Sequence, residues 1–433
     1  MYTLLQKLTK MMVDRKKIPA LEELQAFPFT EPESITFENG CTFSQFKFDS
    51  KDYLYFHLIF FAGRIHSRHK LVAELSIEGI LSGNESKSAA KISSELEFYG
   101  CFIESEAMDE YAVIKVHVLR KYADQVLTNL NDCIRRVSYP DDEFKNICLR
   151  KKSQLQVLLQ RGDILTNRAL RNHMFGDEHP FGRLALPEDY SLNLKPHCQE
   201  FWKEKLSAGP QHIILGGPGE DDLTKLIETL WGKGPRLLNH NPLTFDIHSS
   251  QENRVHINLN STVQSSIKLG MFLPAFSHSD FDMIRMSNLL LSGSFGSRLM
   301  QALREDKGYT YGVYASHYIR QGMSWLDISL ETDIQYVEPA IHEINEVLQR
   351  LHSEPADAEE LFILRNNYVG NMMRKGDGII GLVSMYTTSI VQNLPLNDFV
   401  RFSSFSKTVD GNQIAEISKK YFNLENCKII TCH

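Results

Sequence analysis

Arg304 and Tyr311 are the two residues of this sequence whose types and spacing most clearly suggest chemistry. They lie seven positions apart, and Gly308 stands between them, where a helix would end before a strand rich in tyrosine begins. A guanidinium and a phenol brought together at such a junction both donate hydrogen bonds, so they could hold a peptide carbonyl as it becomes an oxyanion. The same pattern is also ordinary structure, because many helices end in glycine and continue into a strand.

Two short segments around this pair make the pattern more specific. They read Gly-Ser-Phe-Gly-Ser-Arg-Leu over Gly293–Leu299 and Leu-Arg-Glu-Asp-Lys-Gly-Tyr-Thr-Tyr-Gly over Leu303–Gly312. Together they resemble the C-terminal half of the insulinase/pitrilysin family of zinc peptidases, of the mitochondrial-processing-peptidase-like kind. The resemblance covers nearly the whole chain. It implies that Arg304 and Tyr311 bind the backbone of a substrate and help to stabilise the transition state.

Active members of that family carry His-x-x-Glu-His on a helix of the first half, where the two histidines hold zinc and the glutamate is the general base. Here the corresponding helix is expected over 71–83. Counting back from Gly83 places the histidine positions on Glu74 and Glu78 and the general base on Ile77, which cannot transfer a proton. The third ligand is expected in the helix after Asp141, where Arg150, Lys151 and Lys152 would repel Zn²⁺. The sequence therefore predicts no metal in this chain.

Two other arrangements of possible metal ligands remain open. Glu74 and Glu78 could hold a hard cation if further oxygens joined them, but two solvated acids on an amphipathic helix are the favoured interpretation. His66 and His69 have a spacing that can bind a metal on a helix, yet no third histidine or cysteine stands nearby, and a surface loop is favoured.

Two further segments have counterparts in the family. Gly100–Glu106 corresponds to the edge strand on which family members lay their substrate as an added strand, which implies that Phe102, Ile103 and Glu104 contact substrate. The second glycine and the asparagine that the family usually has there are absent. The loop 175–183 resembles one that follows the long helices of the first half, and its His179-Pro180 pair favours a structural role over a catalytic one.

An internal repeat divides the sequence into two similar halves. The segments Tyr122–Ile134 and Tyr336–Leu348 lie 214 positions apart (336 − 122), and both carry apolar residues at helical spacing. Just before each segment, the same distance of 214 positions pairs alternating residues that are typical of a strand. Buried strands are expected over 53–63 and 267–274, each followed by a helix and a Gly/Ser turn. We therefore predict an α+β protein of two repeated domains, each an antiparallel-type sheet covered by helices, which form a clam shell. The predicted boundaries are 1–233, a linker over 234–250, and 251–433.

The composition of the chain restricts the class of protein. With 433 residues, 42% hydrophobic residues and 23% charged residues, it is typical of a soluble globular protein of two or more domains. A net charge of −7 without a basic block argues against nucleic-acid binding, and no segment is long and apolar enough to cross a membrane. Seven scattered cysteines and no signal-like N-terminus predict reduced thiols and a cytoplasmic location.

Together these features predict a division of labour between two chains. The leading hypothesis is the non-zinc-binding subunit of a heteromeric zinc endopeptidase, inactive alone, which supplies Arg304 and Tyr311. A homologous partner would bring His-x-x-Glu-His, the zinc and the attacking water, and the substrate would be a peptide or an extended polypeptide segment. The alternative is a non-enzymatic peptide-binding or scaffold protein derived from the same fold.

Overall fold

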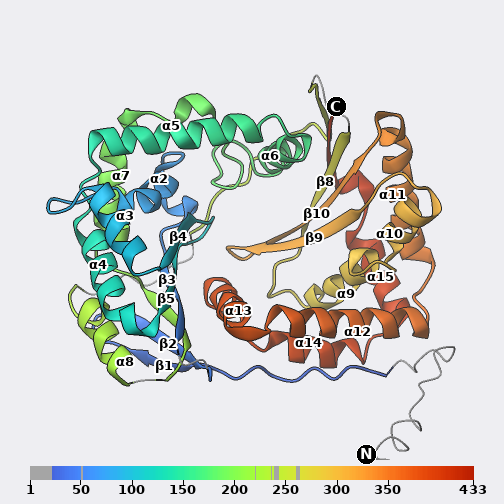
Figure 1. The fold of residues 1–433 in the computed structure, drawn as a ribbon. Coiled ribbons are helices and arrows are strands. Elements are labelled where there is room, and N and C mark those ends of the chain that lie inside the picture. The colour runs from blue at the N-terminus through green and yellow to red at the C-terminus, as the bar shows by residue number, and fades with distance from the viewer. Residues whose placement is uncertain (1–21, 50–51, 220, 236, 238–242, 260–263) are drawn as a thin grey trace, which may run out of the picture.

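The computed structural model describes residues 22–49, 52–219, 221–235, 237, 243–259 and 264–433. Expectations for the first 21 residues and for the middle of the predicted linker 234–250 lie outside these described residues. The described chain forms two α+β halves that face each other, with helices on the outside of each (Figure 1). The predicted fold class is confirmed.

The first half is built on a six-stranded sheet with the strand order β1-β2-β6-β3-β5-β4. All neighbouring strands are antiparallel except β2 and β6, which are parallel. The strands are β1 (Glu33–Thr36), β2 (Thr42–Lys47), β3 (Tyr53–Phe60), β4 (Phe102–Ala107), β5 (Ala112–Leu119) and β6 (His212–Gly217).

The second half repeats this topology in a five-stranded sheet with the order β7-β11-β8-β10-β9. Here too a single pair, β7 and β11, is parallel. Its strands are β7 (Arg254–Ile257), β8 (Ser265–Leu273), β9 (Val313–Arg320), β10 (Met323–Thr332) and β11 (Lys428–Cys432). The order and the directions match β2-β6-β3-β5-β4 strand for strand, which confirms the repeat predicted from the sequence. The exact domain boundaries remain a prediction.

Helices cover the outer face of each sheet. In both halves a strand leads through a short 3-10 turn ending in a tyrosine, Tyr122 or Tyr336, into a long helix, α4 or α11. The covering helices are α2 (Val72–Glu78), α3 (Ala89–Phe98), α4 (Ala123–Arg136), α5 (Asp141–Leu158), α7 (Lys195–Phe201) and α8 (Asp221–Ile227) in the first half. Those of the second half are α9 (Phe281–Ser292), α10 (Arg298–Met300), α11 (Val337–Ser353), α12 (Ala358–Lys375), α14 (Asp398–Ser406) and α15 (Gly411–Tyr421).

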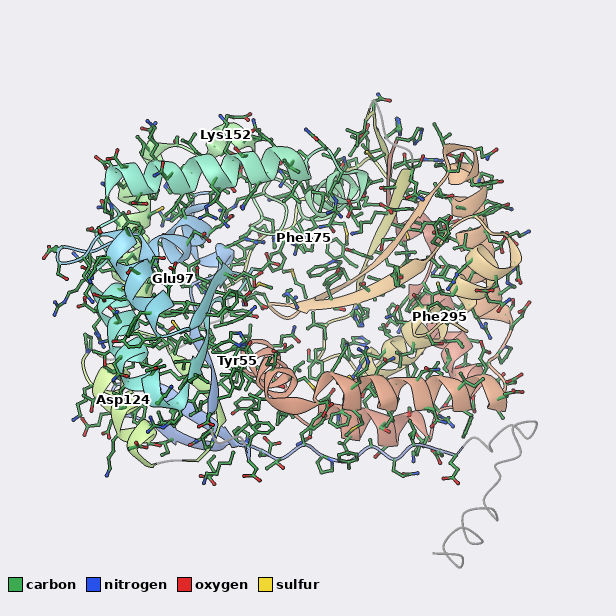
Figure 2. All side chains as sticks on the ribbon, in the orientation of Figure 1. Tyr55, Glu97, Asp124, Lys152, Phe175 and Phe295 are labelled. Atoms are coloured by element: carbon green, nitrogen blue, oxygen red, sulfur yellow. The ribbon has the colours of Figure 1, made fainter. Side chains whose placement is uncertain are left out.

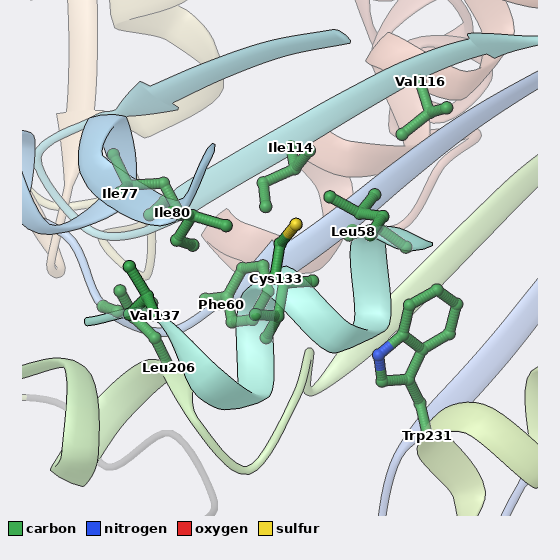
Figure 3. Packing of buried hydrophobic residues seen from close by; sticks show 14 of the residues in the cluster. Leu58, Phe60, Ile77, Ile80, Ile114, Val116, Cys133, Val137, Leu206 and Trp231 are labelled. Atoms are coloured by element: carbon green, nitrogen blue, oxygen red, sulfur yellow. The ribbon is translucent and has the colours of Figure 1, made fainter. Parts of the chain in front are cut away.

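The core of the first half lies between its sheet and these helices. Leu58 and Phe60 of β3 point to the same side as Ile114 and Val116 of β5, because alternate residues of a strand share one face. Opposite them lie residues of α2 and α4 and Trp231 of the helical turn Glu228–Gly232 (Figure 3). The helix predicted over 71–83 is shorter than expected. It gives way at Gly79 to a 3-10 turn, where a Cβ would come within 2.4 Å of the Tyr139 ring.

The inner face of each sheet is covered by a helix from the opposite half. Helix α6 (Gly162–Phe175) packs on β8 and β11, and helix α13 (Gly378–Gln392) packs on β3 and β6. Two glycines allow this approach, since a Cβ on Gly216 would lie 2.5 Å from Ile379 of α13, and one on Gly270 would lie 2.5 Å from Met174 of α6. The two halves are therefore interlocked. Because both faces of β3 are buried, the strand is apolar or aromatic at every position except His57.

Candidate functional site

The segment that carries Arg304 is a helix that ends at the predicted glycine. A short helix over Arg298–Met300 continues as a π-helical turn over Gln301–Asp306, and Gly308 then adopts a φ of +64°, which favours glycine. Arg304 is about one-third exposed, with its guanidinium 4.9 Å from the centre of the exposed Phe295 ring. Its Nε lies 3.5 Å from the neighbouring Glu305 carboxylate.

Tyr311 stands on a loop that is firmly attached to the second sheet. The loop lies between the helix end at Gly308 and β9, so Tyr311 stands at the junction just before the tyrosine-containing strand. The Thr310 hydroxyl donates to the Glu331 carbonyl at 2.7 Å, and the Thr332 hydroxyl donates to the Tyr309 carbonyl at 2.6 Å. With its neighbours fixed in this way, the Tyr311 side chain is 89% exposed. A phenol held on a rigid loop is well placed to donate to a bound molecule.

Tyr311 borders a cavity of about 580 Å³ on the inner face of the second sheet. Tyr314 and Tyr318 line the same cavity, and α6 of the first half closes one side of it. Arg304 is not among the lining residues, and no contact joins its side chain to Tyr311 in the part of the chain that the structure describes. In the free chain the pair is therefore close in sequence but is not assembled around one point.

The same cavity contains a partly buried lysine that the sequence analysis missed. Lys268 of β8 donates to the Asn167 amide oxygen of α6 at 2.8 Å, and burial lowers the pKa of its ammonium group. Asp327 of the neighbouring strand β10 interacts with this lysine. Burial raises the pKa of the Asp327 carboxyl group to about 6, although the positive charges of Lys268 and Arg171 act to lower it. The sequence contained a signal for this pair, because Lys268 and Asp327 are charged residues within otherwise largely apolar strands.

The degenerate zinc motif is filled by a cation of the protein itself. Lys151 of α5 extends its Nζ to within 3.2 Å of Glu74 and 3.3 Å of Glu78, and Arg150 donates to Glu78 at 2.6 Å. Ile77 is 1% exposed and packs into the core (Figure 3). The expectation that Glu74 and Glu78 are solvated acids is wrong. Their side chains are 26% and 19% exposed, and they are ion-paired because α5 packs across α2.

The described residues contain no group of three or more His, Cys, Asp or Glu side chains that could hold a metal. His69 is exposed and stacks on the ring of His197, with 3.9 Å between the ring centres, as expected for a surface loop. His66 ends the short 3-10 helix Arg64–His66. All seven cysteines are free thiols, and six of them are buried.

Strand β4 occupies the edge position predicted for it. It pairs with β5 and ends the strand order of the first sheet, so one side of its backbone has no neighbouring strand among the described residues. Phe102 is 58% exposed, Ile103 packs against the core, and Glu104 lies 4.0 Å from Lys115. Contact of these three residues with a substrate remains a prediction. The Arg304 segment lies in the opposite half of the molecule from α2 and β4 (Figure 1).

Residues 200–368 match a known protein family, the "Peptidase M16 inactive domain", and this range includes Arg304 and Tyr311. A Bacillus subtilis (strain 168) protein named "Uncharacterized zinc protease YmxG" is 23% identical over 304 residues, 67% of this chain and 71% of that one. A Helicobacter pylori protein named "Non-peptidase homolog YmxG" is 21% identical over 379 residues, 85% of this chain and 84% of its own.

A crystal structure described as the peptidase M16 inactive domain from Pseudomonas fluorescens has the same fold. It superimposes with a TM-score of 0.79 at 19% sequence identity, over 93% of this chain and 98% of that one. The resemblance to the insulinase/pitrilysin peptidases is thereby confirmed: residues 200–368 match the peptidase M16 inactive-domain family, and the solved structure has the same fold.

Proposed function

We propose that this chain is the non-zinc-binding subunit of a heteromeric zinc endopeptidase. The proposal rests on the contrast between the degenerate zinc motif of the first half and the Arg304/Tyr311 pair of the second half. Where a zinc ion would sit, the Lys151 ammonium contacts both Glu74 and Glu78. In the other half Tyr311 is 89% exposed and Arg304 is partly exposed, so both donors are accessible to a second chain and its substrate.

In such an assembly the homologous partner would supply the metal, and the metal would activate the attacking water. Tyr311 and Arg304 would donate hydrogen bonds to the substrate carbonyl oxygen, which gains negative charge as the peptide bond is attacked. For this, Arg304 has to leave the Phe295 ring, which is an exposed contact of modest strength. The exposed edge of β4 offers backbone groups to which an extended peptide could add as a further strand.

A second candidate is a peptide-binding or scaffold protein without catalytic activity. Arg304 rests on Phe295 and not beside Tyr311, and one relative is named a non-peptidase homologue. Exposed donors would in that case orient a bound peptide without assisting its cleavage.

For either function we propose a cytoplasmic location, supported by the seven free thiols. No helix in the described part of the chain is long and apolar enough to cross a lipid bilayer.

Co-expression separates the two candidates. The chain would be produced with a homologous chain of the same organism that carries His-x-x-Glu-His, and the purified complex would be tested on a library of quenched fluorescent peptides. The peptidase proposal expects cleavage by the complex, loss of cleavage after zinc removal, and none by either chain alone. If the complex or the single chain binds peptides but neither cleaves them, the result would support the scaffold function and reject the subunit role.

A further inference from the structure

A second cavity lies directly beside the degenerate zinc motif and has a different character. It has a volume of about 380 Å³ and is bounded by the start of α2, by α5, by α6 and by the loop that follows α6. The His66–His69 segment and the loop 175–183, neither of which has a part in the proposed function, meet at its rim. Its charged lining residues are Arg64, Lys70, Glu74, Lys151, Arg168 and Arg183.

Three of the five cations in this lining already have an acidic partner. Arg64 lies 3.3 Å from Asp109, Lys70 lies 3.7 Å from Asp189, and Lys151 is shared between Glu74 and Glu78. Since these three cations are paired, the net charge of the cavity depends mainly on the two remaining cations, Arg168 and Arg183.

Arg168 and Arg183 contact only neutral backbone oxygens in the described structure. Arg168 donates to the Ala185 carbonyl, and one terminal nitrogen of Arg183 donates to the carbonyls of Ser67 and Arg68, each at 3.0 Å. No carboxylate lies within 4.0 Å of either guanidinium among the described residues. Both groups are half-buried, and desolvation lowers the pKa of each. The Glu178 carboxylate acts on Arg183 only from beyond ion-pair distance and opposes the lowering of its pKa, and no carboxylate of the described residues acts in this way on Arg168. An arginine keeps its charge in proteins, so the cavity has an excess of positive charge.

A charge withdrawn from water is costly unless a counter-charge meets it. Guanidinium groups match carboxylates and phosphates in shape, because each can donate two parallel hydrogen bonds to a pair of oxygens. The rest of the lining is partly apolar and includes Leu71, Leu155 and Leu158. The volume is within the range of pockets that hold small organic ligands.

We propose that this cavity binds a small organic anion, with its carboxylate or phosphate group between Arg168 and Arg183 and an apolar body against the leucines. The site adjoins the degenerate zinc motif, because Glu74 and Lys151 line it. Its excess positive charge attracts anions and repels metal cations, which is the opposite of what a zinc site requires. It does not depend on the proposed role of Arg304 and Tyr311.

Calorimetric titration of the full-length chain would test the site with three probes. N-acetyl-leucine carries a free carboxylate, phenyl phosphate carries a phosphate, and N-acetyl-leucinamide is the neutral control. We expect saturable binding of at least one anion, none of the amide, and weaker binding as salt is raised. Whichever anion binds more tightly identifies the natural head group.

Two matched variants localise the binding. Arg168→Gln should weaken it about tenfold or more, because a charge-assisted pair of hydrogen bonds is lost. Lys152→Gln should leave it unchanged, since Lys152 of α5 (labelled in Figure 2) is not among the residues that line the cavity. Melting curves would establish that both variants fold. If Arg168→Gln is unfolded, Arg183→Gln replaces it and should also weaken binding, because Arg183 is the other half of the proposed site. The proposal is overturned if neither anion binds, if the amide binds equally well, or if the Lys152 variant loses as much affinity as the cavity variant.

Discussion

Lys151 shows how a single side chain can take the place of a metal ion. Its ammonium lies within 3.3 Å of both Glu74 and Glu78 and neutralises one unit of their charge, and Arg150 supplies the second positive charge. An ammonium brought by the chain needs no coordination geometry, whereas zinc requires deprotonated ligands at fixed positions. At the same scale, the exposed Tyr311 phenol remains available to act on a substrate.

The role of Tyr311 can be tested by removing one oxygen atom. In a complex with a zinc-bearing partner, Tyr311→Phe should leave assembly intact and lower kcat by about 10²–10³, as expected for the loss of one oxyanion donor. Tyr314→Phe is the matched control, because Tyr314 is also exposed and lines the same cavity. Steady-state kinetics on one peptide substrate would measure both variants. Equal turnover of Tyr311→Phe and wild type would contradict the assigned role.

At the scale of elements, the packing of α5 across α2 decides what stands at the degenerate motif. Position 151 faces positions 74 and 78, while Lys152, one residue later, forms no ion pair with either glutamate in the described structure. The structure thereby gives position 151 the place expected for a third zinc ligand. Ile77 belongs to the core and has no part in this cluster.

This geometry predicts that a zinc site can be rebuilt without changing Ile77. Glu74→His, Glu78→His and Lys151→Glu together should bind about one zinc ion per chain, because two imidazoles and a carboxylate form a common three-ligand set. The control carries the two histidines with Lys152→Glu and should retain much less zinc, since Lys151 still repels the ion. Metal analysis after dialysis would compare them, and equal zinc in both would show that position 151 does not face the site.

Helix α13 is held on the first sheet partly by a buried histidine. His57 of β3 forms a 2.7 Å hydrogen bond with the Thr387 hydroxyl of α13 and another of 2.7 Å with the Tyr55 hydroxyl. Burial, together with the nearby Lys115 and His117, lowers the pKa of His57 to about 3. The imidazole is therefore neutral in the folded protein at every pH at which an unfolded histidine gains its proton.

The contribution of His57 to stability should consequently be complete above pH 6.5 and should be lost as the pH falls toward 3. Between pH 7 and pH 5 this amounts to about 2 kcal/mol of the free energy of unfolding. His57→Gln should show a pH dependence weaker by that amount in urea titrations. His342→Gln, which replaces an exposed histidine of α11, should behave like wild type. An unchanged pH dependence in the His57 variant would refute this explanation.

At the scale of the whole molecule, the two halves are bound together by exchanged helices. Phe175 of α6 contacts Trp325 of the second sheet, with 5.1 Å between the ring centres, and lies between the halves (Figure 2). In return, Leu382 and Val383 of α13 pack on Tyr55 and its neighbours in the first sheet. Each half therefore depends on the other to cover an apolar sheet face.

Separate expression of 1–233 and 251–433 should yield unstable fragments. Each would expose the inner face of its sheet and an unpartnered helix, and apolar patches of this kind cause aggregation. Co-expression of the two fragments should restore a soluble complex, observable by size-exclusion chromatography. Two monomeric, fully folded fragments would instead show that the helix exchange contributes little to stability.

Much of the fold was predictable from the sequence because it depends on local periodicity. The apolar spacing around Tyr122 and Tyr336 predicted the paired long helices, and the alternation before them predicted the strands. The helix end at Gly308 was also predictable, since few other residues accept a positive φ. The ion-paired state of Glu74 and Glu78 was not, because their partner is more than seventy residues away and its direction depends on how α5 crosses α2.

The sequence by itself determined the repeat, the absence of His-x-x-Glu-His over 71–83, and the presence of Arg304 and Tyr311 at their spacing. These are properties of residue type and order. Only the tertiary structure decided that Lys151 occupies the place of the metal, that Arg168 and Arg183 share a cavity, and that α6 and α13 exchange sheets. The physical reason is that such contacts join residues far apart in the chain, and packing between helices and sheets fixes which of many possible partners meet.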